Sequence, residues 1–491
     1  MFNPRKLFMA IPLDLLLVAC GGDNDDDDDN VTGGDPTGDL RIVHAVSDAP
    51  AVDVEATAGG STSTPITGLD FAGTTGFLTL PATTYDFDVL ANLPDGSTTS
   101  VLALPGLAVD EGQAATAVVV GTAAAGDSYD LEAVTFNPSA STPGSGEVSI
   151  VAAHASTAAD AAASSGVDVY VTAPGTDVTA TSPAFTFGYT DTVDATASGA
   201  LPAGQYQIQI TPEGSDTVVY DSGTVDLSPF AGAEIAIVAV NTVNQVEQSA
   251  APVKLLAIVG GTIVELLDTD TQAGVKVAHV SPDAGDVDVT ANGSGYLSGV
   301  PYLGVNVDAS TYDELATGSY DLNVQAAGSG TDVLSSPVTA VLEAGTEYSV
   351  LALGNVADIG GTPATAFDLT PTVDDNRSIA TQASVKIVHG APAVGNVDVY
   401  VTPAGDFSTS EILNGAATPL LSDFPFRDVT DYVAVSAGDY DIRVVERSGG
   451  TMAINAEGVT LSNGDVITAI ARQPDGVDGN PAGAGLLLLT N

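Results

Sequence analysis

The chain contains 491 residues, of which 11 are lysine or arginine and 63 are aspartate or glutamate, giving a net charge of −52. Hydrophobic residues make up 44% and charged residues only 15%, so the composition predicts packed domains with an acidic surface rather than disorder. The charge excludes binding to nucleic acids and to anionic lipid head groups, and one cysteine with four histidines excludes disulfide frameworks and zinc clusters.

The N-terminal residues have the pattern of an exported, lipid-modified protein. Two basic residues precede an apolar run, Leu7 to Ala19, that matches a signal-peptide core and is too short to span a bilayer. The sequence Leu-Val-Ala-Cys20 resembles the bacterial lipoprotein box. It implies cleavage of residues 1–19 and acylation of Cys20, with palmitate among the acyl groups, as a membrane anchor. Gly21 resembles the pattern sorted to the outer membrane, where the protein would face the surface or the periplasm.

Residues 20–39 are rich in aspartate, glycine and threonine and have no apolar periodicity. Because like charges repel and no face can be buried, this segment is expected to be a disordered acidic tether. The spacing excludes an EF-hand, since Asp28 stands where the turn glycine belongs and Gly34 where the bidentate glutamate belongs. A weak cation-binding segment and an export signal for surface display are the alternatives.

Four copies of one motif follow the tether. In each copy a histidine is followed by a Val-Asp-Val triplet and later by a tyrosine after a tight turn. The histidines lie 110, 125 and 110 residues apart, and the histidine-to-aspartate offset is nine residues except in copy two, where it is fourteen. The recurring residues are His44, Asp53 and Tyr85; His154, Asp168 and Tyr206; His279, Asp288 and Tyr320; and His389, Asp398 and Tyr440.

These copies predict an all-β protein. Short stretches rich in valine, threonine and isoleucine alternate with glycine- and proline-containing turns, and helical periodicity is nowhere sustained. About seven strands in roughly 100 residues favour an antiparallel, Ig-like β-sandwich of the transthyretin or fibronectin type. We expect four tandem domains with separate cores and short linkers, as beads on a string. Their predicted bounds are 40–137, 147–268, 274–370 and 384–491.

The first copy resembles a known family. His44 is followed by Asp48-Ala-Pro-Ala-Val-Asp53-Val, and the family signature reads roughly Val-His-Ala-Ser-Pro-Asp-Ala-Pro-Ala-Val-Asp-Val-Tyr. The signature is that of domain-of-unknown-function family 4397, which occurs as repeats in secreted and lipid-anchored bacterial proteins. Copy two has an insertion and copy four has Ala393 in place of the first aspartate, so only the histidine and the later aspartate carry over. The resemblance implies a fold but no chemistry.

Strand alternation places each histidine on an inward face. In copy three, Val275, Val277 and His279 share one face and Lys276 lies on the other. A buried imidazole needs hydrogen-bond partners, so we interpret the histidines as structural corner residues. A metal ligand is the alternative hypothesis, although each copy offers a single histidine, and catalysis is the third.

The recurring aspartates lie opposite the valines of their triplets, towards solvent or a sheet edge. Because calcium prefers clustered carboxylates, a calcium site is one hypothesis for Asp48, Asp53, Asp283, Asp286 and Asp288, and a structural role is the other. Each recurring tyrosine should insert its ring into the core while its hydroxyl binds a backbone group, as in a tyrosine corner.

Together these patterns predict a non-enzymatic protein. The sequence has no Gly-x-Ser-x-Gly elbow, no His-Glu-x-x-His and no phosphate-binding loop. We expect no cofactor, calcium excepted, and a lipid-anchored envelope protein whose domains project as an anionic rod towards a protein or glycan partner. A calcium-dependent ligand- or glycan-binding module and an envelope hydrolase are the rival hypotheses. The acidic surface also suits a halophilic or marine bacterium, because salt screens its self-repulsion.

Overall fold

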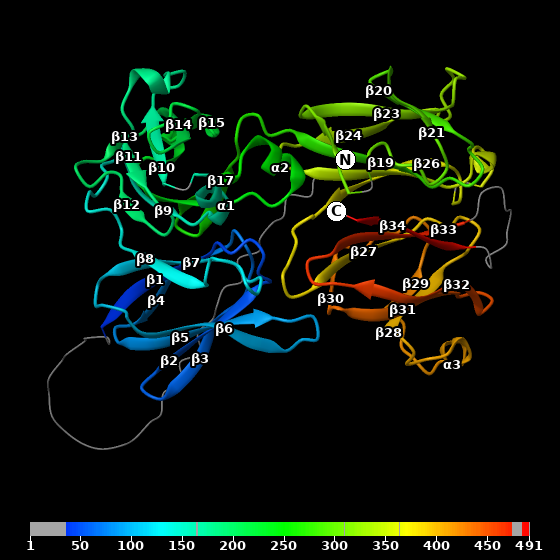
Figure 1. The fold of residues 1–491 in the computed structure, drawn as a ribbon, viewed down its shortest axis with the longest axis horizontal. Helices are drawn as coiled ribbons and strands as arrows, with labels where there is room; N and C mark the ends of the chain where they lie inside the picture. Colours follow the sequence, from blue (N-terminus) through cyan, green and yellow to red (C-terminus); the bar gives the residue numbers. More distant parts are fainter. Residues whose placement is uncertain (1–35, 164, 309, 363, 474–483, 491) are drawn as a thin grey trace, which may run out of the picture.

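The computed structural model describes residues 36–163, 165–308, 310–362, 364–473 and 484–490. The predicted signal peptide, Cys20 and most of the predicted tether lie outside these residues. The described chain forms four β-sandwiches of two sheets each (Figure 1), which confirms the predicted all-β class and tandem domains. Within the described ranges, no helix has both the length and the apolar character needed to cross a membrane.

Domain one is built from eight strands. They are β1 (Thr37–His44), β2 (Val52–Ala58), β3 (Ser61–Leu69), β4 (Thr74–Pro81), β5 (Thr84–Asn92), β6 (Thr98–Ala108), β7 (Ala114–Val120) and β8 (Glu132–Phe136). The two sheets have the strand orders β4-β1-β7-β8 and β3-β2-β5-β6. Strand β1 begins three residues before the predicted boundary, because its backbone already pairs with β4 from Thr37 onward.

Domain two has the same plan with additions. Its strands are β9 (Glu147–His154), β10 (Val167–Thr172), β11 (Phe185–Phe187), β12 (Thr192–Asp194), β13 (Leu201–Pro202), β14 (Gln205–Pro212), β15 (Tyr220–Asp226), β16 (Glu234–Asn241), β17 (Val253–Val259) and β18 (Thr262–Leu266). Its helices are α1 (Thr157–Ala162), α2 (Gln245–Ala250) and the 3-10 turns η1 (Val178–Ala180) and η2 (Ser228–Phe230). The sheets are β11-β10-β14-β15 and β12-β9-β16-β17-β18, with β13 also on β9. The alanine-rich insertion forms α1, which Ser156 caps by accepting the N–H of Ala159.

In their described residues, domains three and four have eight strands each. Domain three contains β19 (Ala273–His279), β20 (Val287–Ala291), β21 (Ser294–Val300), β22 (Asp313–Leu315), β23 (Gly318–Ala326), β24 (Val338–Leu342), β25 (Glu347–Leu353), η3 (Val356–Asp358) and β26 (Asp368–Asp374). Domain four contains β27 (Ala383–His389), β28 (Val397–Pro403), α3 (Thr409–Leu413), β29 (Leu421–Phe424), β30 (Val433–Val435), β31 (Gly438–Glu446), β32 (Thr451–Leu461), β33 (Val466–Arg472) and β34 (Gly485–Thr490). Strand β26 passes the predicted domain end at residue 370, and Pro371 is tolerated because β26 is an edge strand.

One pair of strands in each sandwich is parallel rather than antiparallel. The strand that carries the histidine lies inside its sheet and runs parallel to a late strand: β1 with β7, β9 with β16, β19 with β25 and β27 with β33. Parallel strands need a long crossover, and in each sandwich the chain between them forms the second sheet together with an edge strand of the first. Strands β19 and β25 are buried along their whole length, as expected of parallel strands covered on both faces.

The second face of these strands is covered by a neighbouring domain. The outer faces of the histidine-bearing sheets of domains one and two share one apolar cluster, made of Val43, Ala45, Val118, Val120, Val151, Ala153, Ala155, Ala236, Val238, Val240, Leu256 and Ile258. Domains three and four meet in the same way through Ala278, Val280, Leu351, Leu353, Val388, Ile470 and Leu489. The expectation of beads on a string was therefore wrong, because the residues that alternate with the inward ones are also apolar.

The two pairs are further joined into a two-by-two arrangement (Figure 1). Helix α2 of domain two contacts domain three, where the Val246 N–H donates to Glu347 Oε1 at 3.2 Å. The segment between domains three and four reaches back to domain one, where the Ala380 N–H donates to the Asp48 carbonyl at 2.8 Å. These contacts close the arrangement, so the predicted rod is replaced by a compact assembly of four sandwiches.

We predict that Leu351→Ala lowers the free energy of unfolding by about 2–5 kcal/mol, because it opens a cavity in the interface between domains three and four. Leu351 is fully buried, whereas Val341, a matched β-strand residue of the same domain, is 61% exposed. Val341→Ala should cost less than about 1 kcal/mol. Urea denaturation of both variants measures the difference, and equal small losses would contradict the buried interface.

Candidate functional site

The recurring histidines close a corner between the first strand of each domain and the bend that follows. His44 Nδ1 accepts the N–H of Val46 at 3.2 Å, and the other three histidines accept the N–H two residues later in the same way. His44 Nε2 lies 3.2 Å from the Pro50 carbonyl oxygen. In copies three and four the equivalent carbonyls are those of Gly285 at 2.7 Å and Gly395 at 3.0 Å. Because Nδ1 accepts, Nε2 carries the hydrogen and donates it.

Burial keeps the imidazoles of His44, His154 and His389 neutral at neutral pH. It lowers the pKa of His44 to about 4, and it also lowers the pKa values of His154 and His389 below their ordinary range. In copies one, three and four both ring nitrogens are already used by backbone groups. The lone pair of Nδ1 in these copies is therefore already used by a backbone N–H and is not available to a metal or to a substrate proton. This agrees with the interpretation of the histidines as structural corner residues.

The aspartates of the triplets hold β-bulges. In copies one, three and four the carboxylate accepts an N–H from a residue with positive φ, at the point where the neighbouring strand shifts its register. These bonds join Asp53 to Gly68 at 2.8 Å, Asp288 to Gly299 at 2.7 Å and Asp398 to Asp423 at 2.8 Å. In copy two, which has no such shift, Asp168 binds the Thr186 hydroxyl and the Gly214 N–H.

The earlier aspartates of copies one and three cap a turn instead. Asp48 accepts the N–H groups of Ala123 and Ala124 at 2.8 and 2.9 Å, just after β7. Asp283 accepts two equivalent N–H groups after β25, those of Val356 and Ala357, at 2.7 and 3.0 Å. Each carboxylate ties the first bend of its domain to the turn after the parallel partner strand.

Copy four makes the same connection with donor and acceptor reversed: the bend supplies a backbone N–H and the distant segment supplies a side-chain oxygen. Ala393 stands where the aspartate is missing, and its backbone N–H donates to Gln473 Oε1 at 2.7 Å. Sequence reasoning missed Gln473, because nothing in the local pattern marks a glutamine at the end of β33 as the replacement for a distant aspartate.

The five calcium candidates are not brought together. Asp48 and Asp283 lie at the capped turns, Asp53 and Asp288 lie at the bulges, and Asp286 is exposed. Across the described residues, no group of three or more histidine, cysteine, aspartate or glutamate side chains is arranged to hold a metal ion. The N–H groups of Gly328 and Gly299 hold the pKa of Asp288 below its ordinary value. Backbone donors thus occupy the oxygens that calcium would need.

The recurring tyrosines form the expected corner. In every copy the hydroxyl donates to the carbonyl of the residue four positions earlier, at 2.8–3.1 Å. The pairs are Tyr85 with Pro81, Tyr206 with Pro202, Tyr320 with Ala316, and Tyr440 with Ser436. The tyrosine thus fixes the turn that leads into the second sheet.

The scarce cations gather where domains and segments meet, a feature that sequence reasoning missed. Arg41, Lys276 and Lys386 each stand three residues before a histidine and are only 2%, 1% and 3% exposed. Arg41 donates to Thr116 Oγ1 at 3.0 Å. Lys386 of domain four forms a 2.7 Å ion pair with Asp374 of β26 in domain three. The recurrence of a basic residue three positions before the histidine was the sequence signal that could have indicated these buried cations.

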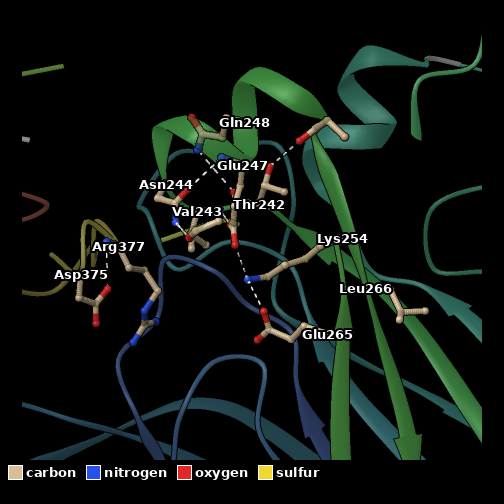
Figure 2. Close-up of polar contacts among 12 residues, drawn as sticks. Thr242, Val243, Asn244, Glu247, Gln248, Lys254, Glu265, Leu266, Asp375 and Arg377 are labelled. Atoms are coloured by element: carbon tan, nitrogen blue, oxygen red, sulfur yellow. Dashed lines mark hydrogen bonds and ion pairs between the residues drawn. The ribbon is translucent and has the colours of Figure 1, made fainter. Parts of the chain in front are cut away.

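Figure 2 shows a second group of charges, centred on the buried Lys254. Lys254 of β17 lies between Glu247 of α2 and Glu265 of β18, at 3.1 Å from each carboxylate. Nearby, Arg377 extends from the segment before β27 to Asp70 of domain one, at 2.6 Å. Since an isolated buried charge is costly, these carboxylates stabilise the cations at the junction of the domains.

We predict that the stabilising contribution of His44 is lost on acidification. Its pKa is about 4 in the folded protein and about 6.5 when unfolded. Between these values only the unfolded chain takes up the proton, so stability falls as pH drops from 6.5 to 4 and levels off below 4. The loss should be on the order of 3 kcal/mol.

The test is an NMR titration of the His44 ring protons together with urea denaturation at several pH values. His44→Gln should be less stable than the wild type at pH 7, and the difference should shrink towards pH 4. An apparent His44 pKa above 6 would contradict the buried corner.

We also predict that Asp288→Ala lowers the melting temperature by a few degrees, because the N–H groups of Gly299 and Gly328 lose their acceptor. Asp286→Ala, in the exposed bend just before β20, is the matched control and should change little. Calorimetry with calcium, and with sodium chloride of equal ionic strength, separates the two hypotheses. We expect no calcium-specific stabilisation of the wild type, and a clear one would restore the calcium site.

Comparison with solved structures gives distant likenesses. The TIE protein of Bacillus anthracis is 11% identical, with 64% of this chain and 50% of that chain covered and a TM-score of 0.14, so the chain spans half its length. A "putative adhesin" of Bacteroides ovatus is 9% identical (47% and 95% covered, TM-score 0.13). A "putative cell adhesion protein" of Bacteroides fragilis is 11% identical (44% and 97% covered, TM-score 0.12). Likenesses of this size assign no function.

The comparison of families is more decisive. Curated proteins give no match. A family model described as Domain of unknown function (DUF4397) matches residues 38–170 and 273–400. Each match begins in the first strand of one domain and ends in the triplet strand of the next. The first match runs from β1 to β10 and the second from β19 to β28. With more than half of its residues matched, this chain belongs to the DUF4397 family.

Proposed function

We propose that this protein is a non-enzymatic, lipid-anchored protein of the cell envelope, with a structural, adhesive or binding role towards a protein or glycan. The observation that carries the proposal is that the recurring histidines, aspartates and tyrosines are engaged in corners, bulges and turns of the fold. Residues repeated four times for such contacts support a building module better than a repeated catalytic centre. The neutral, buried His44 is also unsuited to acid–base catalysis at neutral pH.

The distribution of charge supports a role at the outer surface. Among the residues that the structure describes, five basic ones are buried, namely Arg41, Lys254, Lys276, Lys386 and Arg443. The chain has only 11 basic residues against 63 acidic ones, so its surface is even more anionic than the composition implies. Such a surface repels other polyanions and keeps the assembly hydrated, as expected for contact with neutral glycans or proteins in salty surroundings.

The anchor would reach the assembly through domain one. Cys20 is the proposed lipidation site, and the predicted tether connects it to β1, whose first residue is Thr37. In this arrangement the lipid holds one corner of a compact block of sandwiches at the outer membrane, and several equivalent surfaces are available for weak, multivalent contacts.

We predict that Cys20→Ala moves the protein from the membrane fraction to the soluble fraction without changing its circular dichroism spectrum. Metabolic labelling with radioactive palmitate and cell fractionation of both forms provide the measurement. Ser63→Ala, at an exposed position of β3 and with the cysteine retained, is the control for handling. A wild-type protein that stays soluble and unlabelled would rule out the anchor.

Protease treatment of intact cells then tests whether the domains lie on the cell surface or in the periplasm. Loss of the domains while a periplasmic control protein survives supports a surface role in adhesion, whereas protection until the envelope is opened supports a structural role in the periplasm. Because compact sandwiches can resist proteases, lysed cells are treated in the same way as a control. Cleavage there shows that the protein can be cut once the protease reaches it.

A further inference from the structure

The interior of domain two is not filled. Between its two sheets lies a cavity of about 200 Å³, whereas the corresponding spaces in domains one and four measure about 20 and 50 Å³. Protein interiors are normally close-packed, with few voids larger than a water molecule. A void of this size in one of four related sandwiches therefore requires an explanation.

One cause of the cavity is a small residue at a position where the other copies have larger ones. Two residues before the histidine, the inward side chain is Ile42, Val277 or Ile387 in copies one, three and four, but Ala152 in copy two. Ala152 lines the cavity, together with Ala239 of β16. The apolar lining indicates that the space stays dry unless an apolar molecule enters it.

A second difference places a hydrogen-bond donor at the cavity wall. Between its histidine and its aspartate, copy two is five residues longer than the others, and this segment forms α1 in place of the bend whose carbonyl binds Nε2 in the other copies. His154 lines the cavity and is 2% exposed, and its Nδ1 accepts the Ser156 N–H at 3.3 Å. Its Nε2 therefore carries the hydrogen. Within the described ranges, no hydrogen-bond acceptor is found for it.

We infer that domain two binds a small, neutral, mainly apolar molecule with one oxygen acceptor, such as a ketone, whose oxygen accepts the hydrogen of His154 Nε2. A 150 Å³ apolar cavity suffices for benzene, so this one suits a ligand of roughly eight to ten non-hydrogen atoms. A carboxylate is disfavoured, because a neutral imidazole would leave its charge uncompensated in an apolar interior. This binding goes beyond the proposed envelope function and does not depend on it.

The environment of His154 agrees with a neutral ligand. Burial lowers the pKa of its imidazole below the ordinary value, so the ring is uncharged at neutral pH. The rings of Phe187 and Tyr189 lie 5.4 and 6.2 Å from the imidazole centroid and hold it in place. Entry requires local opening, for which the three-residue edge strands β11 and β12 are suited, since few backbone hydrogen bonds hold them.

The test is titration of the full chain with acetophenone and with ethylbenzene, a probe of similar shape that lacks the oxygen, followed by calorimetry and ligand-observed NMR. We expect acetophenone to bind about fivefold or more tightly than ethylbenzene, the gain of one hydrogen bond. Ala152→Ile, which restores the side chain of copies one and four, should fill the cavity and weaken both probes at least tenfold while keeping the fold. Ala197→Ile, on the exposed surface of the same domain, is the matched control and should bind as the wild type.

His154→Leu tests the donor separately and should reduce acetophenone binding to the level of ethylbenzene. If this variant fails to fold, the comparison between Ala152→Ile and Ala197→Ile still decides the location of the site. The inference would be overturned if the wild type bound neither probe up to its solubility, if both probes bound equally, or if Ala152→Ile left their affinity unchanged.

Discussion

The architecture depends on one constraint: the parallel strands at the centre of each sandwich are apolar on both faces. The inward face of β1 joins its own core through Leu40 and Ile42, and the outward face presents Val43 to a second domain. A single sandwich can bury only one of these faces. Pairing of domains buries the other, and because all four copies share the pattern, two pairs form.

Pairing also determines where the few cations can lie. In a chain with a net charge of −52, a basic residue on the surface would find acidic neighbours almost anywhere. Instead Arg41, Lys276 and Lys386 occupy outward strand positions that the structure buries, with rings or carboxylates beside them. Their removal from the surface leaves an anionic exterior. Burial of a paired charge adds little net stability, but leaving its partner alone is costly, so these contacts favour one arrangement of the domains.

The recurring motif explains folding rather than chemistry, and the copy that departs from it is the informative one. In copies one, three and four the bend returns a carbonyl to the histidine, and a carboxylate or glutamine ties that bend to the turn after the parallel strand. In copy two the insertion of α1 breaks the first of these contacts. The freed His154 donor and the alanine at position 152 occur in the same sandwich, and together they turn a packed core into a candidate ligand site.

The sequence by itself determined the four repeats, the all-β class, the inward histidines and the tyrosine corner. These features rest on period-two alternation and on turns a few residues long, such as the one that joins Tyr85 to Pro81. Only the tertiary structure decided the parallel pairs, the partner of each outer face, the N–H groups that occupy Asp53 and Asp288, and the empty core of domain two. Each of these depends on residues far apart in the chain: Arg377 binds the Ser47 carbonyl across 330 positions. No local pattern encodes such a partner, because burial and hydrogen-bond satisfaction are settled only when the separate sheets pack against one another.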